Sequence, residues 1–98
     1  MDEQSVARLA EAIEWAETME IELLLLGSAE EQFDFAEAFL GVLSDDPPKA
    51  IYSGEKVIDV FVNRDGMSHE EAVEWYEFNV IGSYMGENTP LFIMSFEP

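Results

Sequence analysis

The sequence of 98 residues has no cysteine and very few cations. Without cysteine, disulfide bridges and thiol chemistry are excluded. Four basic residues stand against 22 acidic ones, which gives a formal net charge of −18. Binding to nucleic acid requires Lys and Arg to neutralise phosphates, and docking on anionic membranes has the same requirement. We therefore expect no direct contact with DNA, RNA or a membrane surface.

Long apolar runs are also missing from the sequence. No run exceeds four residues, the length of the leucine run at residues 23–26, which is far too short to cross a bilayer. The N-terminal segment lacks both the basic region and the hydrophobic region of a signal peptide. The expected location is therefore cytoplasmic.

Motifs for catalysis or cofactor binding are absent from the sequence. It has no Ser-His-Asp arrangement in a supporting context and no glycine-rich phosphate loop. Asp45, Asp46 and residues 63–66 offer oxygen ligands, but they lack the alternating positions and the terminal Glu of a calcium loop. His69, the only histidine, is expected to be a solvated residue in the first turn of a helix. We expect no enzyme activity, no cofactor and no specific metal site.

Apolar residues, by contrast, are plentiful. The chain is 48% hydrophobic and 12% aromatic, which argues against disorder because disordered acidic chains are poor in aromatics. The length fits one domain spanning residues 1–98. Only a few carboxylates can find a basic partner within such a chain. Most are therefore expected in water or against a basic partner.

Periodicity and turn signals predict an α+β fold with about four helices packed on a small sheet of about three strands. The predicted helices cover residues 4–18, 28–43, 55–64 and 68–82, and the predicted strands cover residues 20–26, 49–52 and 91–96. Two alternatives remain open. Residues 20–26 contain good helix formers and can continue the first helix. Residues 55–64 are rich in β-branched side chains and can form a strand.

Two helix starts carry the spacing of a capping box, in which a Ser is followed three residues later by a Glu. Ser28 precedes Glu31 in this way, and Ser68 precedes Glu71. Both serines are therefore predicted to be N-caps.

A further pattern covers roughly residues 39–93, and the string FNVIGSYMGENTP is its most specific part. Its other elements are Tyr52, Asp65-Gly66-Met67 and Glu70-Glu71-Ala72. The pattern resembles small proteins of tailed phages and prophages, which are mostly of unassigned function. The resemblance implies a phage or prophage origin, a compact α+β domain and a location in the host-cell cytoplasm. It brings no catalytic residues with it.

Acidic residues recur at helical spacing in three rows. The first row is Glu11, Glu14 and Glu17, the second is Glu30, Asp34 and Glu37, and the third is Glu70, Glu74 and Glu77. On a helix, a rise of ~1.5 Å per residue separates successive carboxylates of the second and third rows by about 5–6 Å. For comparison, DNA carries one phosphate per ~3.4 Å per strand. An ordinary helix surface mixes charges of both signs. We interpret the rows as a nucleic-acid-like charge surface, although three solvated helix faces would show the same spacing.

The predicted function is therefore stoichiometric. We expect a phage-encoded acidic inhibitor that binds the basic nucleic-acid-binding surface of a host defence protein, as a DNA mimic does. CRISPR and restriction complexes are the expected class of target, which makes the protein resemble anti-CRISPR proteins in its action. The nine carboxylates of the three rows are the predicted partner-binding residues.

Three other interpretations remain open. The first is a non-enzymatic structural or regulatory phage protein that acts as a homodimer, with Trp15, Phe35 and Phe78 as interface anchors. The second is halophilic adaptation, in which acidity serves solubility alone. The third is a small enzyme, for which the sequence names no residues.

Overall fold

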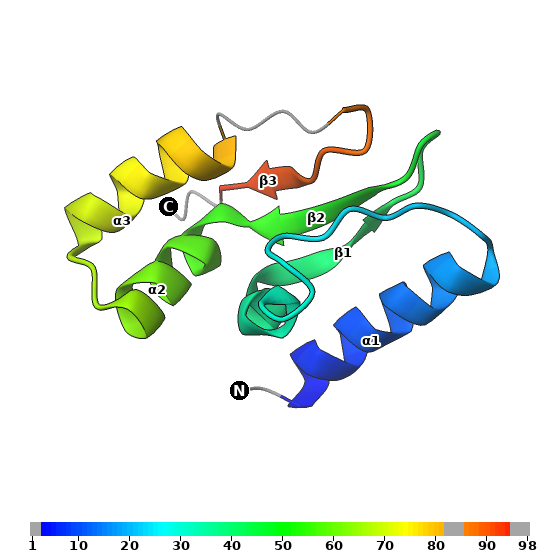
Figure 1. Ribbon diagram of the computed structural model, residues 1–98, viewed down its shortest axis with the longest axis horizontal. Coiled ribbons are helices and arrows are strands. Elements are labelled where there is room, and N and C mark those ends of the chain that lie inside the picture. Colours follow the sequence, from blue (N-terminus) through cyan, green and yellow to red (C-terminus); the bar gives the residue numbers. More distant parts are fainter. Residues whose placement is uncertain (1–2, 82–85, 95–98) are drawn as a thin grey trace.

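The computed structural model describes residues 3–81 and 86–94 (Figure 1). The helical elements are α1 (Glu3–Thr18), the 3₁₀ helix η1 (Gln32–Ala38), α2 (Gly54–Asp65), and α3 (His69–Trp75), which continues as the π-helical segment η2 (Tyr76–Ile81). The strands are β1 (Phe39–Leu43), β2 (Lys49–Ser53) and β3 (Leu91–Ile93). This composition confirms the predicted α+β class, with four helices and a sheet of three strands in the described residues.

The sheet has the order β1-β2-β3 and is mixed. Strand β2 pairs antiparallel with β1 and parallel with β3. A parallel pair needs a long crossover connection, and here α2 and α3 lie in that connection. Figure 1 shows α1 beside β1, whereas α2 and α3 lie together at the left-hand end of the sheet.

Aromatic side chains join the three strands on one face of the sheet. Phe39 of β1 and Phe92 of β3 are both directly opposite Tyr52 of β2. The ring centroids of Phe39 and Tyr52 are 5.6 Å apart, and those of Tyr52 and Phe92 are 5.9 Å apart. Tyr76 of η2 meets the Phe92 ring edge-on at 5.8 Å. We call these four rings the aromatic ladder, and it forms the part of the core that connects the sheet to η2.

Helices α2 and α3 begin where the sequence indicates. The Ser53 hydroxyl accepts a hydrogen bond from the Lys56 N–H, so α2 is a helix and the strand alternative for this segment is wrong. At α3, the Ser68 hydroxyl accepts from the Glu71 N–H at 3.2 Å, while the Glu71 carboxylate accepts from the Ser68 N–H. The capping box predicted at Ser68 is therefore confirmed.

Residues 20–26 form neither the predicted strand nor a continuation of α1. Glu20 adopts a left-handed conformation, with φ of 55°, which ends the helical course of the chain after α1. Both edges of β2 are occupied by β1 and β3, so a strand here has no free place beside β2. Leu23, Leu25 and Leu26 pack against the core instead. The Leu26 N–H donates to the Tyr52 hydroxyl at 2.9 Å, and the Asn88 side chain donates to the Glu22 carbonyl.

The helix predicted over residues 28–43 is wrong for most of its length. Residues 28–31 form a turn, in which the Ser28 hydroxyl donates to the Glu31 carboxylate and does not cap a helix. A short 3₁₀ helix follows, and the chain becomes extended at Phe39, where pairing with Tyr52 begins. Pairing with β2 therefore prevails over the local helical pattern.

Strand β1 contains one extra residue relative to its partner. Phe39 pairs with Tyr52 and Gly41 pairs with Ile51, which leaves Leu40 without a residue opposite. At the other edge of the sheet, β3 has three residues. The predicted strand over 91–96 is therefore shorter in its described part, and its end lies outside the described residues, as do Gly82 and Tyr84.

Burial of Tyr52 generates a prediction about alkaline unfolding. Desolvation raises the pKa of Tyr52 from 10.0 to about 12, although the hydrogen bond from Leu26 opposes this rise. Folding therefore favours the neutral hydroxyl. The resulting contribution to the free energy of unfolding is fully present below pH 10 and is lost as the pH rises through 12. The shift corresponds to a loss of about 3 kcal/mol in the free energy of unfolding.

Tyr52→Phe tests this expectation in urea unfolding experiments between pH 7 and 12. At pH 7 the variant should be less stable by about 1 kcal/mol, because the Leu26 N–H loses its acceptor. Above pH 10 the wild-type protein should lose stability faster than the variant. Parallel losses in the two proteins would contradict the assigned burial effect.

Candidate functional site

The nine carboxylates predicted to bind a partner all belong to exposed residues. Glu11, Glu14 and Glu17 lie on α1, and Glu70 and Glu74 lie on α3. None of these five forms an ion pair with another described residue. These carboxylates therefore have no ion-pair partner among the described residues, although Arg8 also lies on α1 and lines a shallow groove together with Glu11.

The second row does not form the predicted helical stripe. Glu30 lies in the turn before η1, outside the helix. Because a 3₁₀ helix has three residues per turn, Asp34 and Glu37 lie on the same side of η1. This segment therefore presents a pair of carboxylates in place of a row of three.

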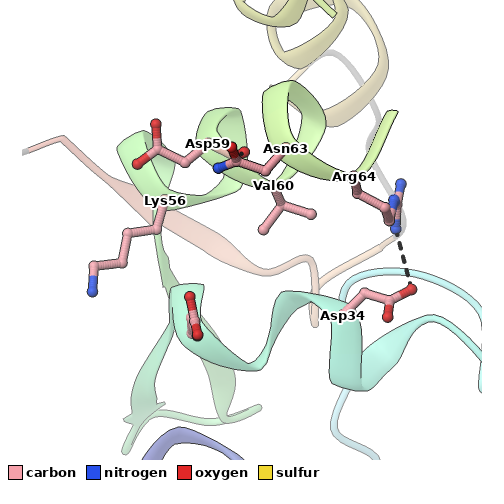
Figure 2. Close-up of a pocket in the computed structure, with 7 residues that line it drawn as sticks. Asp34, Lys56, Asp59, Val60, Asn63 and Arg64 are labelled. Atoms are coloured by element: carbon pink, nitrogen blue, oxygen red, sulfur yellow. Dashed lines mark hydrogen bonds and ion pairs between the residues drawn. The ribbon is translucent and has the colours of Figure 1, made fainter. Parts of the chain in front are cut away.

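Asp34 and Glu37 line a groove between η1 and α2, with a volume of about 440 Å³ (Figure 2). We call it the mixed-charge groove. The side chains that line it are Asp34, Glu37, Lys56, Asp59, Val60, Asn63 and Arg64. Two of the four basic residues of the chain are in this set. The groove is therefore not a purely acidic surface.

Arg64 is the centre of charge neutralisation in this region. Its guanidinium lies 3.0 Å from the Asp65 carboxylate, 3.4 Å from Asp34 and 3.6 Å from Glu31. The hydrogen bond to Asp65 is the main cause that raises the pKa of Arg64, and it lowers the pKa of Asp65. The guanidinium also lies over the Phe35 ring, 5.0 Å from its centroid. Asp34, predicted to face a partner, is thus already paired within the chain.

The three predicted aromatic anchors differ in exposure. Phe78 is 79% exposed and Trp15 is 40% exposed, so both are available at the surface. Phe35 is only 4% exposed, and its ring packs against Phe61 at 5.9 Å. The prediction that Phe35 is an anchor is therefore wrong, because η1 directs its side chain into the core.

A second, more apolar groove lies between α2, α3, η2 and β3, with a volume of about 720 Å³. We call it the acidic-rimmed groove. Its lining consists of Glu55, Ile58, Asp59, His69, Val73, Tyr76, Glu77, Ile81, Phe92 and Met94. Burial raises the pKa of Tyr76. The groove places Glu77 of the third row beside apolar side chains.

The acidic-rimmed groove was not predicted, because its sides come from elements that are separated along the chain. The signal available in the sequence is the apolar content of residues 91–94, which predicts a strand but does not show which other elements that strand faces. The π-helical turn of η2 is a second reason why the groove was not predicted. It is wider than an α-helical turn, and it follows Trp75 immediately, so the third row does not continue as a straight α-helical stripe to Glu77.

Residues 3–81 and 86–94 contain no group of three or more side chains placed to hold a metal ion. No helix in this part of the chain is long and apolar enough to cross a bilayer. Comparisons with protein-family models, curated proteins and solved structures gave no match.

The Arg64 cluster generates a prediction about stability and salt. Arg64→Ala should lower the free energy of unfolding by about 1 kcal/mol, because it leaves three carboxylates without their cation and removes the contact with Phe35. Added NaCl should reduce this loss, because it screens repulsion among the carboxylates.

Lys56→Ala is the matched control for Arg64→Ala. It removes the same charge from the same groove, but Lys56 forms no ion pair with a described residue. Thermal unfolding at several salt concentrations should show a clearly smaller effect for the control. Equal effects in the two variants would mean that net charge alone, and not the Arg64 contacts, determines stability.

Proposed function

We propose that this protein is a non-enzymatic acidic inhibitor of phage origin that binds the basic nucleic-acid-binding surface of a host protein. The observation that carries this proposal is the set of exposed carboxylates on α1 and α3 that form no ion pair with another described residue. The phage origin rests on the sequence resemblance described above. A host defence complex is the proposed class of target.

Charge balance supports a basic partner. Two of the four cations are already used, since Arg64 pairs with carboxylates near η1 and Lys49 lies 3.7 Å from Asp45. Most of the net charge of −18 therefore faces solvent. Such a surface attracts a cationic protein over a long range and raises the rate of association. It repels nucleic acids and other copies of the same chain.

The arrangement of the rows limits how a partner is engaged. Figure 1 shows α1 at the lower right, beside β1, and α3 at the upper left, beyond the other end of the sheet. A partner that contacts one of these rows therefore does not have to contact the other. We assign the main contact to the row on α3 and η2, because it lies next to the acidic-rimmed groove.

Displacement of a labelled oligonucleotide from purified CRISPR and restriction complexes tests the proposal. The wild-type protein should compete with the oligonucleotide, and high salt should weaken the competition. The triple variant Glu70→Lys, Glu74→Lys, Glu77→Lys should compete at least about tenfold less well, because rim charges control association.

A matched control separates this row from net charge. The triple variant Glu3→Lys, Glu22→Lys, Glu87→Lys changes the same number of exposed acids outside the three rows. It should retain most of the competition. Equal losses in both variants would contradict the assignment of the row, and a wild-type protein that displaces no oligonucleotide would contradict the proposed function.

Exposed apolar side chains support one alternative, a structural or regulatory homodimer. Phe78, Trp75 and Ile81 are all exposed in the region of α3 and η2. Sedimentation at several concentrations separates the two proposals. The inhibitor should remain a monomer, whereas the alternative requires a dimer that becomes more stable when salt screens the repulsion between the copies.

A further inference from the structure

We propose that the acidic-rimmed groove binds a segment of the partner protein in which apolar side chains are flanked by Lys or Arg. This inference rests on the proposed function and adds a defined anchoring site to it. The groove supplies apolar contacts, while the carboxylates around it supply the selection for a cationic segment.

The floor of the groove is apolar and is formed by three parts of the chain. Ile58 comes from α2, Val73 and Tyr76 come from α3 and η2, and Phe92 comes from β3. Ile58 and Tyr76 are each 5% exposed, so they form a closed base. Burial of an apolar side chain of the partner against this base stabilises a complex.

The floor is fixed by contacts with the core. The Phe92 ring belongs to the aromatic ladder, where it contacts both Tyr52 and Tyr76. Gly54 allows the Tyr76 hydroxyl and the Met94 sulfur to lie close to the backbone at the start of α2. A β-carbon at this position would overlap both groups. The groove is therefore formed before a ligand arrives, which reduces the conformational entropy lost on binding.

Carboxylates surround this apolar floor. Asp59 and Glu55 lie on α2, and Glu77 lies on η2. Glu70 and Glu74 of the neighbouring helix are exposed as well. Among the described residues that line the groove there is no Lys or Arg, and His69 is the only basic side chain. A cationic segment therefore gains favourable interactions at the rim, whereas a second copy of this acidic chain or a nucleic acid is repelled.

The combination of floor and rim defines the chemistry of the ligand. A cationic segment without apolar side chains gains only the screened attraction of exposed charges. A neutral apolar segment gains only the burial of its side chains against the floor of the groove. Apolar anchors surrounded by a polar rim are the usual arrangement of strong contacts in protein interfaces.

Synthetic peptides provide the probe for this site. The test peptide has 12 residues that alternate Lys and Leu, and the control peptide replaces each Leu with Ser. Binding is followed at low salt by amide chemical shifts of the labelled full chain. The Lys-Leu peptide should shift residues of the groove, including Val73, Ile81 and Phe92. It should also bind at least about tenfold more tightly than the Lys-Ser peptide.

Two double variants localise the binding. Ile81→Ser with Met94→Ser removes groove side chains that are 52% and 40% exposed, and Leu40→Ser with Leu43→Ser removes β1 side chains that are 45% and 38% exposed. The groove variant should bind the Lys-Leu peptide about tenfold more weakly, and the β1 variant should bind it as the wild type does. Equal affinities in the two variants, or equal binding of the two peptides, would overturn the proposal.

A third variant tests the rim without altering the floor. Asp59→Asn with Glu77→Gln removes two negative charges from exposed residues. It should bind the Lys-Leu peptide more weakly than the wild type at low salt, and the difference should vanish at high salt. Unchanged affinity at low salt would overturn the role of the rim.

The oligonucleotide displacement assay separates this inference from the proposed function. If the wild type displaces the oligonucleotide and the Ile81→Ser, Met94→Ser variant does so equally well, the groove is not the anchor and the proposed function stands. If the peptide binds in the groove and the wild type displaces no oligonucleotide, the proposed function fails and the binding preference of the groove stands.

Discussion

Three aromatic rings side by side, Phe39, Tyr52 and Phe92, connect the strands of the sheet and join them to η2 through Tyr76. This packing is the interaction on which the remaining structure depends. A chain with a net charge of −18 repels itself when it becomes compact. Apolar burial must offset that repulsion, and Tyr52 contributes at the centre of the sheet, where it also holds Leu26 through its hydroxyl group.

Two of the four cations form ion pairs with carboxylates of the described residues. Arg64 lies among three of them beside η1, and Lys49 neutralises Asp45 near the turn between β1 and β2. The row carboxylates on α1 and α3 form no ion pair with another described residue, although Arg8 lies on α1 near Glu11. The ion-paired carboxylates and the row carboxylates therefore belong to different parts of the surface. We propose that a partner binds the row on α3 and η2, beside the acidic-rimmed groove.

Local signals in the sequence were sufficient for α1, α2, α3 and β2, because caps and periodicity act over a few residues. The capping box at Ser68 and the left-handed Gly66 after α2 are examples. Residues 20–43 were mispredicted because their conformation depends on β2, whose partners lie on both sides of it in the sequence. Exposure of the three acidic rows was expected from composition. The pairing of Asp34 with Arg64 and the acidic-rimmed groove were not predictable, because each joins residues that are distant in the sequence.

The irregular pairing at Leu40 has a consequence for how this molecule meets other proteins. A regular, unpaired edge strand is a template for further strands and for fibre growth. In β1 the extra residue interrupts the spacing of backbone donors and acceptors, and β3 at the opposite edge has only three residues. Neither edge offers a long template to an incoming chain. Edge-to-edge pairing is therefore disfavoured at both sides of the sheet, which opposes the stacking of copies into continuous sheets in a concentrated solution.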